Sequence, residues 1–202
     1  MLSNAGKEFS AEKITNYYNT QNEKNKSGIE KKTIYNYVEK LEKAYLISRV
    51  KRFNIVGKEV LKTIEKHYAI DTGFRTINTN LINYEDTFFL ENIIYNELLI
   101  RGYNVDVGMV EYNYCAEDKR KVQKQLEVDF VCNQGSKRLY VQSALALPTK
   151  EKEEQEQLSL QNISDSFKKI IIVKEGPTHY NESGILILNL FDFLLKENGL
   201  EY

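Results

Sequence analysis

Three oxygen-bearing side chains in the second half of the sequence could act together: Glu91, Asp129 and Gln142. Carboxylate and amide oxygens are the ligands that hard cations such as Mg²⁺ prefer. A metal ion held in this way can support hydrolysis of a phosphodiester, provided that another group positions or polarises the attacking water. Glu91, Asp129 and Gln142 are therefore candidate catalytic residues, with Glu91 and Asp129 as weak ligands of Mg²⁺ or Mn²⁺.

The elements that must position these side chains have the pattern of a small α/β domain. Helical periodicity predicts a helix over residues 86–101, which carries Glu91 and is ended by Gly102. Strands follow, and then a highly charged segment of helix-forming composition over 150–162 leads to a buried-type strand over 169–173. The other predicted elements are strands over 103–107, 110–115, 126–132 and 139–147, a charged loop over 117–125, a strand over 184–190 and a final helix over 191–196. An open sheet with helices on its faces fits this order, so we expect a mixed α+β fold.

The order helix, three strands, helix, strand resembles the restriction-endonuclease-like core of the PD-(D/E)xK type. That core carries an acid on its first helix, an Asp on its second strand and Glu/Gln-x-Lys on its third. Glu91, Asp129 and Gln142-Ser143-Ala144 occupy the matching positions. Because residue 144 is alanine, the lysine that would position the attacking water is missing.

The missing lysine makes a degenerate site the leading interpretation of this unit. Lys150 and Lys152 come after the third strand and would have to reach back to replace it. Two alternatives stay open. One is an active metal-dependent nuclease that cleaves DNA, and the other is a purely structural role, in which Glu91 pairs with an arginine and Asp129 lines a solvent-facing strand.

The first part of the chain differs from the second in charge. Residues 1–68 carry 14 Lys and Arg against 8 Asp and Glu, a net charge of +6, whereas residues 69–202 carry 14 against 21, a net charge of −7. Such a contrast suggests two units with different partners. A basic unit of this size is compatible with nucleic acid, and a solvated surface is the alternative.

The basic unit has the pattern of a winged helix-turn-helix. Ser10 is a good N-cap for a helix to about residue 19, with Ile14, Tyr17 and Tyr18 as its apolar residues. Ser27 and Glu30 have capping-box spacing and would open a second helix, which runs to about residue 44. The buried stripe predicted for this helix is Ile34, Val38, Leu41 and Tyr45. Strands over 46–53 and 67–70, with a turn at Gly57, complete the arrangement.

In a winged helix-turn-helix the second helix enters the major groove and the hairpin contacts the backbone. The candidate DNA-binding residues are Lys32, Asn36, Lys40 and Lys43 on the outer face of the helix, and Arg49, Lys51, Arg52 and Lys58 on the hairpin. Glu39 shares the outer face and repels phosphate. Because winged helices also dock on proteins, docking without nucleic acid is the alternative.

Whole-chain features exclude several other classes of protein. The longest aliphatic run is residues 170–173, and residues 1–10 show no signal-peptide core, so we expect a cytoplasmic protein without a membrane segment. Cys115 and Cys132 are expected to be free thiols, and His67 to be structural. The segment Gly57-Lys58-Glu59 lacks the pattern of a phosphate loop, so we expect no ATP site in this chain.

Motifs along nearly the whole of residues 1–195 resemble one family. Examples are Thr33-Ile34-Tyr35-Asn36-Tyr37 and Glu127-Val128-Asp129-Phe130-Val131. The other stretches are residues 2–7 with Ser10, 41–44, 52–53, 57–58, 68–73, 90–98, 101–105, 140–142 and 163–165. The family is the C-terminal region of uncharacterised prokaryotic AAA+-type ATPases, in which a P-loop core precedes a winged helix and a degenerate restriction-endonuclease-like domain of unknown function.

This resemblance implies a winged helix over residues 1–72, a degenerate nuclease-like domain over residues 73–202 and a non-catalytic module that binds DNA or a protein partner. ATP would act only through an ATPase core, which this chain does not contain, and that core or another protein is a possible partner. A docking or oligomerisation module without nucleic-acid contact is the remaining alternative.

Overall fold

The computed structural model describes residues 9–21, 28–78, 86–115 and 120–201 of the 202-residue chain. The chain divides into two compact units. Unit 1 comprises Met1–Val50 and Thr63–Asn83, and unit 2 comprises Lys51–Lys62 and Tyr84–Tyr202. The turn of the first hairpin, which the sequence analysis placed in a domain ending at residue 72, therefore groups with unit 2.

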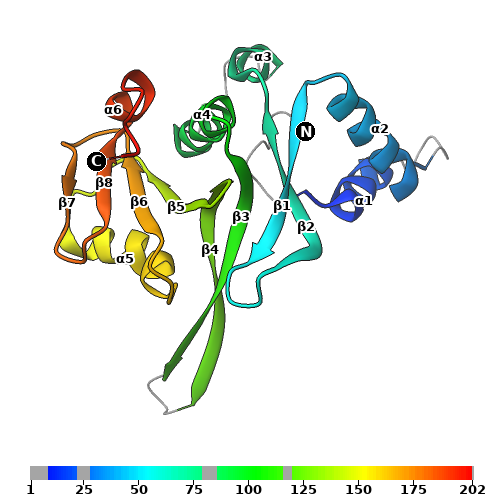
Figure 1. The fold of residues 1–202 in the computed structure, drawn as a ribbon. Helices are drawn as coiled ribbons and strands as arrows, with labels where there is room; N and C mark the ends of the chain where they lie inside the picture. The colour runs from blue at the N-terminus through cyan, green and yellow to red at the C-terminus, as the bar shows by residue number, and fades with distance from the viewer. Residues whose placement is uncertain (1–8, 22–27, 79–85, 116–119, 202) are drawn as a thin grey trace. The chain divides into compact units, whose positions relative to one another are not determined.

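Unit 1 begins with two helices, α1 (Ala11–Gln21) and α2 (Lys31–Lys43), followed by parts of strands β1 (Ile47–Asn54) and β2 (Glu59–Ala69) and by α3 (Thr72–Asn78) (Figure 1). The hydroxyl of Ser10 accepts a hydrogen bond from the backbone N–H of Lys13 (3.2 Å), which confirms the predicted N-cap. Ala11, Ile34, Val38 and Ile47 form the small core of this unit.

The predicted burial of Tyr45 is wrong, and the large apolar residues of α1 are not the ones that this helix buries. Ile14, Tyr17 and Tyr18 are exposed, because α1 buries the small residues Ala11 and Thr15 instead. Tyr45 is 78% exposed, because α2 ends before it and its backbone has a positive φ of 55°, which takes the side chain out of the helical stripe.

The predicted capping box is also wrong. Glu30 is the N-cap of α2 and forms no side-chain capping hydrogen bond, whereas Ser27 lies outside the described residues. Instead, a side chain of α1 holds the backbone just before α2. The side-chain amide of Asn19 accepts a hydrogen bond from the N–H of Ile29 (2.8 Å) and donates one to its carbonyl oxygen (3.2 Å).

Unit 2 is built on a mixed sheet, which confirms the predicted mixed α+β class. The full strand order is β2-β1-β3-β4-β5-β6-β8-β7. β3 pairs antiparallel with β4, and β4 with β5, while the β1–β3, β5–β6 and β6–β8 pairs are parallel. The elements are α4 (Asp86–Ile100), β3 (Asn104–Cys115), β4 (Lys121–Gln134), β5 (Lys137–Ala144), α5 (Lys150–Gln161), β6 (Lys168–Val173), β7 (His179–Tyr180), β8 (Leu186–Asn189) and α6 (Leu190–Leu195).

Helices cover both faces of this sheet (Figure 1). The ring of Phe130 on β4 lies 6.1 Å from the ring of Tyr95 on α4. Its neighbour Val131 joins a core cluster with Leu160 of α5. Because successive side chains of a strand point to opposite faces, α4 and α5 lie on opposite sides of the sheet. At the end of α4, Arg101 donates hydrogen bonds to three carbonyl oxygens at or just beyond the end of α6, and so holds α6 beside α4.

In unit 2, β3 and β4 differ clearly from their predicted limits. β3 continues through Gly108, where we expected a break, and its ladder with β4 shifts register between Asp106 and Gly108. β4 begins at Lys121, so the expectation of a loop over residues 117–125 is wrong for residues 121–125. Within the parts of the chain that are described, no helix is long and apolar enough to cross a membrane.

Candidate functional site

Asp129 lies in the middle of unit 2, on β4, and is 8% exposed. Its Oδ2 accepts hydrogen bonds from the backbone N–H of Ser143 (2.8 Å) and from the Ser143 hydroxyl (2.6 Å). Its Oδ1 accepts a weaker one from the side-chain amide of Gln142 (3.3 Å). These donors belong to β5, so the carboxylate fixes one strand to the next.

Beside this carboxylate, the side chain of Gln142 takes the place of a backbone partner between β4 and β5. The last β4–β5 pair is Phe130 with Val141, and beyond it the Gln142 Oε1 accepts a hydrogen bond from the N–H of Asp129 (3.2 Å). The two strands are therefore bridged by side chains where their backbones no longer pair. Asp129 and Gln142, predicted as parts of one site, lie together.

The remaining members of the predicted site do not complete a metal centre. Glu91 is buried on α4, and Ala144 belongs to the apolar core on the α5 side of the sheet. The two lysines that would have to substitute for the missing one have acidic neighbours, since Lys152 pairs with Glu156 and Lys150 lies 3.7 Å from Glu182. Among the described residues no three His, Cys, Asp or Glu side chains are grouped as a metal site requires.

The outer face of α2 presents the predicted basic residues to solvent. Lys32, Asn36 and Lys40 are exposed, and the Lys40 ammonium lies 5.9 Å from the centre of the Tyr37 ring. Lys43 is exposed as well, but its Nζ lies 2.6 Å from a carboxylate oxygen of Glu39, one turn away. Lys32, Asn36 and Lys40 are thus the members of this face best placed to contact a ligand.

The basic residues of the β1–β2 hairpin differ in their surroundings, since two are paired with carboxylates and two are exposed. Arg49 makes a two-pronged hydrogen bond to Glu42 (2.7 and 2.8 Å), and this carboxylate raises the pKa of Arg49. Arg52 is 9% exposed and lies 2.9 Å from Glu127. Lys51 and Lys58 are exposed. Arg49 and Arg52 are therefore held by acidic neighbours within the protein.

The buried His67 belongs to a partly exposed polar cluster that sequence reasoning did not find. Its Nε2 lies 3.1 Å from Glu42, its ring packs edge-on against Phe9 at 5.2 Å, and it is 4% exposed. Burial lowers the pKa of His67 more than the neighbouring Glu42 raises it. Glu65 and Arg49 also face this cluster. Because the cluster joins α2 to two strands, no local sequence signal marks it.

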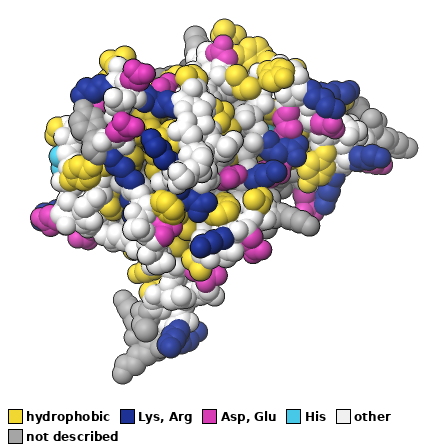
Figure 2. Space-filling view, in the orientation of Figure 1, with side chains coloured by type: hydrophobic (Ala, Val, Ile, Leu, Met, Phe, Trp, Pro, Cys, Tyr) yellow, Lys and Arg dark blue, Asp and Glu magenta, His cyan; other side chains and the backbone are white. Residues whose placement is uncertain are grey.

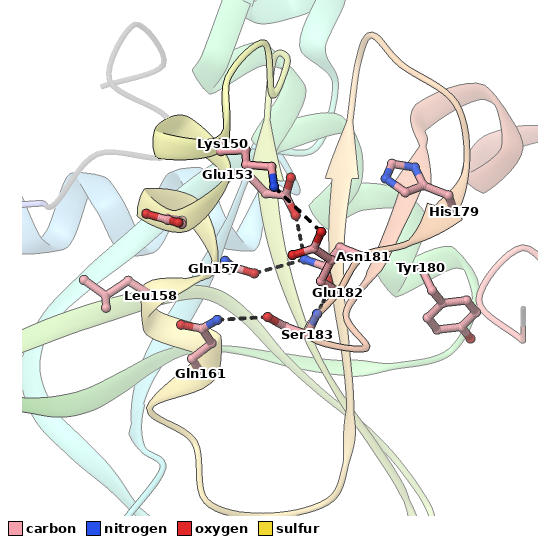
Figure 3. Close-up of a pocket in the computed structure, with 11 residues that line it drawn as sticks. Lys150, Glu153, Gln157, Leu158, Gln161, His179, Tyr180, Asn181, Glu182 and Ser183 are labelled. Atoms are coloured by element: carbon pink, nitrogen blue, oxygen red, sulfur yellow. Dashed lines mark hydrogen bonds and ion pairs between the residues drawn. The ribbon is translucent and has the colours of Figure 1, made fainter.

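A polar groove of about 630 Å³ lies between α5 and the segment that includes β7 (Figure 3). The side-chain amide of Asn181 donates hydrogen bonds to Glu153 (2.7 Å) and to the buried Gln157 (3.0 Å). The side-chain amide of Gln161 donates a hydrogen bond to the hydroxyl of Ser183 (3.2 Å). These polar groups bind one another across the groove. The sequence indicated only a charged helix here, because the two walls are far apart along the chain.

The fold and these sites define a two-unit α+β protein with a basic helix face and a carboxylate bonded to neighbouring protein groups. Residues 3–84 match the family model "Domain of unknown function (DUF8612)". The chain is also similar to an uncharacterised protein of Haemophilus influenzae, with 34% identity over 166 residues. That match covers 81% of this chain but only 37% of the length of the relative. No solved structure matches the chain.

Proposed function

We propose that the chain is a non-catalytic DNA-binding module of an AAA+-type ATPase. In this proposal residues 1–72 form a winged helix-turn-helix that places the outer face of α2 in the major groove. The observation that carries it is the exposed set Lys32, Asn36 and Lys40 on one face of a helix, in a region of net positive charge. Lysine ammonium groups contact phosphates, and an asparagine amide can bind a base edge.

Unit 2 is, in the same proposal, a degenerate restriction-endonuclease-like domain. The order α4, β3, β4, β5, α5, β6 supports this assignment, as does the position of Asp129 where β4 and β5 stop pairing. Ser143 and Gln142 donate hydrogen bonds to both carboxylate oxygens, and Ala144 is packed in the core. Glu91, Asp129 and Gln142 are then remnants of a nuclease site and serve the packing of the sheet.

The connection to an ATPase rests on the resemblance of the sequence, and the length of the Haemophilus influenzae relative is consistent with it. Nearly two thirds of that protein lies outside the stretch that this chain matches. A protein of that length has room for a further domain such as an ATPase core. ATP binding and hydrolysis would belong to that domain.

Charge reversal on α2 tests the DNA-binding proposal. We expect Lys32→Glu/Lys40→Glu to weaken binding of a fluorescent random duplex at least tenfold, measured by fluorescence anisotropy at low salt. The matched control is Lys137→Glu/Lys150→Glu, which makes the same change of charge at two exposed positions of unit 2. Equal weakening by both pairs, or no weakening by the α2 pair, would contradict the role of this face.

Docking on a protein is the second candidate, and one observation favours it. Unit 1 exposes Tyr17 on α1, Tyr35 and Tyr37 on α2, and Tyr45 just beyond α2. Exposed tyrosines are frequent at protein interfaces, because the ring buries apolar area while the hydroxyl stays hydrogen-bonded. If the chain binds no duplex at low salt, this surface becomes the leading candidate, and a separately expressed ATPase core is the partner to test by titration calorimetry.

A further inference from the structure

The β3–β4 hairpin continues beyond the sheet of unit 2 as a two-stranded arm. β1 pairs with β3 only as far as Met109, and the β4–β5 ladder ends at Phe130. From Val110 to Cys115 the described ladder joins β3 to β4 alone, down to Lys121. Figure 1 shows the arm leaving the sheet, and in Figure 2 it is the narrow projection with basic side chains near its end.

Two tyrosines and a lysine lie on one face of this arm. Side chains alternate along a strand, so Tyr112 and Tyr114 share a face with Lys124 and Val122, their partners across the ladder. The two tyrosine rings are stacked, with centroids 5.3 Å apart and planes 18° from parallel. Tyr114 is 38% exposed. Tyr112, Tyr114, Val122 and Lys124 are called the tyrosine face below.

The basic side chains in the described part of the arm favour an anionic ligand. The described part of the arm carries Arg120, Lys121 and Lys124. Its acidic residue, Glu111, lies on the face opposite the tyrosines, and so does Lys121, the ladder partner of Cys115. There Glu111 accepts a hydrogen bond from Gln123 (2.8 Å). Lys121 and Lys124 are exposed, and neither forms an ion pair with a described residue. Among the described residues, the tyrosine face is therefore aromatic, carries the ammonium group of Lys124 and has no carboxylate.

We propose that the tyrosine face binds single-stranded nucleic acid. Every base has a flat π-face that can stack on an exposed aromatic ring, and basic side chains beside the rings contact the phosphates. Single strands suit this face because their bases are open to stacking, whereas those of a duplex are paired. The site uses residues of unit 2 only and shares none with α2. The inference is therefore tested independently of the function proposed above.

A single tryptophan at residue 114 reports directly on stacking. The sequence contains no tryptophan, so Tyr114→Trp gives one indole at a known place, whose emission can be excited apart from that of the tyrosines. We expect a thymidine oligonucleotide of about 20 nucleotides, longer than one stacking site, to quench this emission, and added salt to reverse the effect. Tyr180→Trp, at an exposed position on β7, is the matched control and should not be quenched.

Three results would overturn the inference. The first is unchanged emission of Tyr114→Trp in a chain whose circular dichroism is that of the wild type. The second is equal quenching of Tyr180→Trp, which would indicate coating of the whole surface. The third is equal quenching by a duplex of the same length, which would remove the reason for a single strand.

Further variants separate stacking and charge from folding of the arm. We expect Tyr112→Phe/Tyr114→Phe to bind the oligonucleotide within twofold of the wild type, because the rings remain. Tyr112→Ala/Tyr114→Ala should bind at least about tenfold more weakly. Lys124→Glu, the change of a lysine on the tyrosine face, should lower the salt-dependence slope by about 0.7, which corresponds to one lost phosphate contact. Weak binding by the phenylalanine pair, or an unchanged slope, would contradict the stacking model. Lys32→Glu/Lys40→Glu should leave quenching of Tyr114→Trp intact.

Discussion

The carboxylate of Asp129 accepts its hydrogen bonds from Ser143 and Gln142, and both donors come from the neighbouring strand. A hydrogen bond to a charged acceptor stabilises a fold more than one between neutral groups. The sequence could predict that Asp129 and Gln142 meet, because they lie on consecutive strands of the expected order. It could not predict the contact with Ser143, which depends on where the β4–β5 ladder ends.

Removing this carboxylate should destabilise the protein. Asp129→Ala leaves the buried N–H and hydroxyl of Ser143 without their acceptor. We expect the free energy of unfolding, measured with urea, to fall by about 2–3 kcal/mol. As a control, Glu182→Ala removes an exposed carboxylate and should change this value by less than about 0.5 kcal/mol. Equal stabilities for wild type and Asp129→Ala would argue against a structural role.

His67 makes a second prediction at the residue scale, on pH dependence. Burial lowers its pKa in the folded protein below the ordinary 6.5, so the unfolded chain takes up the proton first. The stabilisation from neutral His67 is therefore present above pH 6.5 and is lost as the pH falls through the folded-state pKa.

The measurement compares urea unfolding of the wild type and His67→Gln over a series of pH values. The stability advantage of the wild type should shrink as the pH falls below 6.5. The exposed His179→Gln variant is the control and should follow the wild type. An advantage that grows on acidification would mean that the charged imidazole pairs with Glu42 strongly enough to outweigh burial.

At the scale of elements, the strongly periodic and apolar segments were the predictable ones. α4, β6 and α6 lie close to their expected positions, because their apolar residues fill the core of unit 2. The strands β2 and β4, which have polar ends, are longer than predicted. β2 begins at Glu59 instead of residue 67, and β4 at Lys121, because pairing with a neighbour extends a strand past its apolar stretch. In α1 the small residues are buried and the large apolar ones are exposed. Hydrophobicity alone does not predict this pattern.

Gly108 shows how close the strands of unit 2 approach. A Cβ at this position would lie 2.8–2.9 Å from the side chains of Val131, Ile55 and Val128. We expect Gly108→Ala to lower the free energy of unfolding by about 1–3 kcal/mol through overpacking. Gly28→Ala is the control, because its nearest neighbour lies at 3.6 Å. Thermal unfolding of both variants tests this, and a Gly108→Ala protein as stable as the wild type would show that β3 has room to move.

At the scale of the whole molecule, the two parts of the chain differ in net charge. The net charge is +6 over residues 1–68 and −7 over residues 69–202. We propose duplex binding for the basic helix face of unit 1 and a structural role for Asp129 and Gln142 of unit 2. Sequence reasoning reached the first assignment from helical spacing and charge. It missed the arm, because residues 121–125 read as a charged loop.

One titration tests the central claim, that the chain binds DNA without cleaving it. A labelled random duplex is titrated with the wild-type chain at two salt concentrations in the presence of Mn²⁺, and the DNA is then run on a denaturing gel. We expect binding that weakens steeply with salt, with a slope that reports the number of phosphate contacts, and DNA of unchanged length. Absence of binding at low salt would contradict the DNA-binding role, and Mn²⁺-dependent cleavage would contradict the degenerate site.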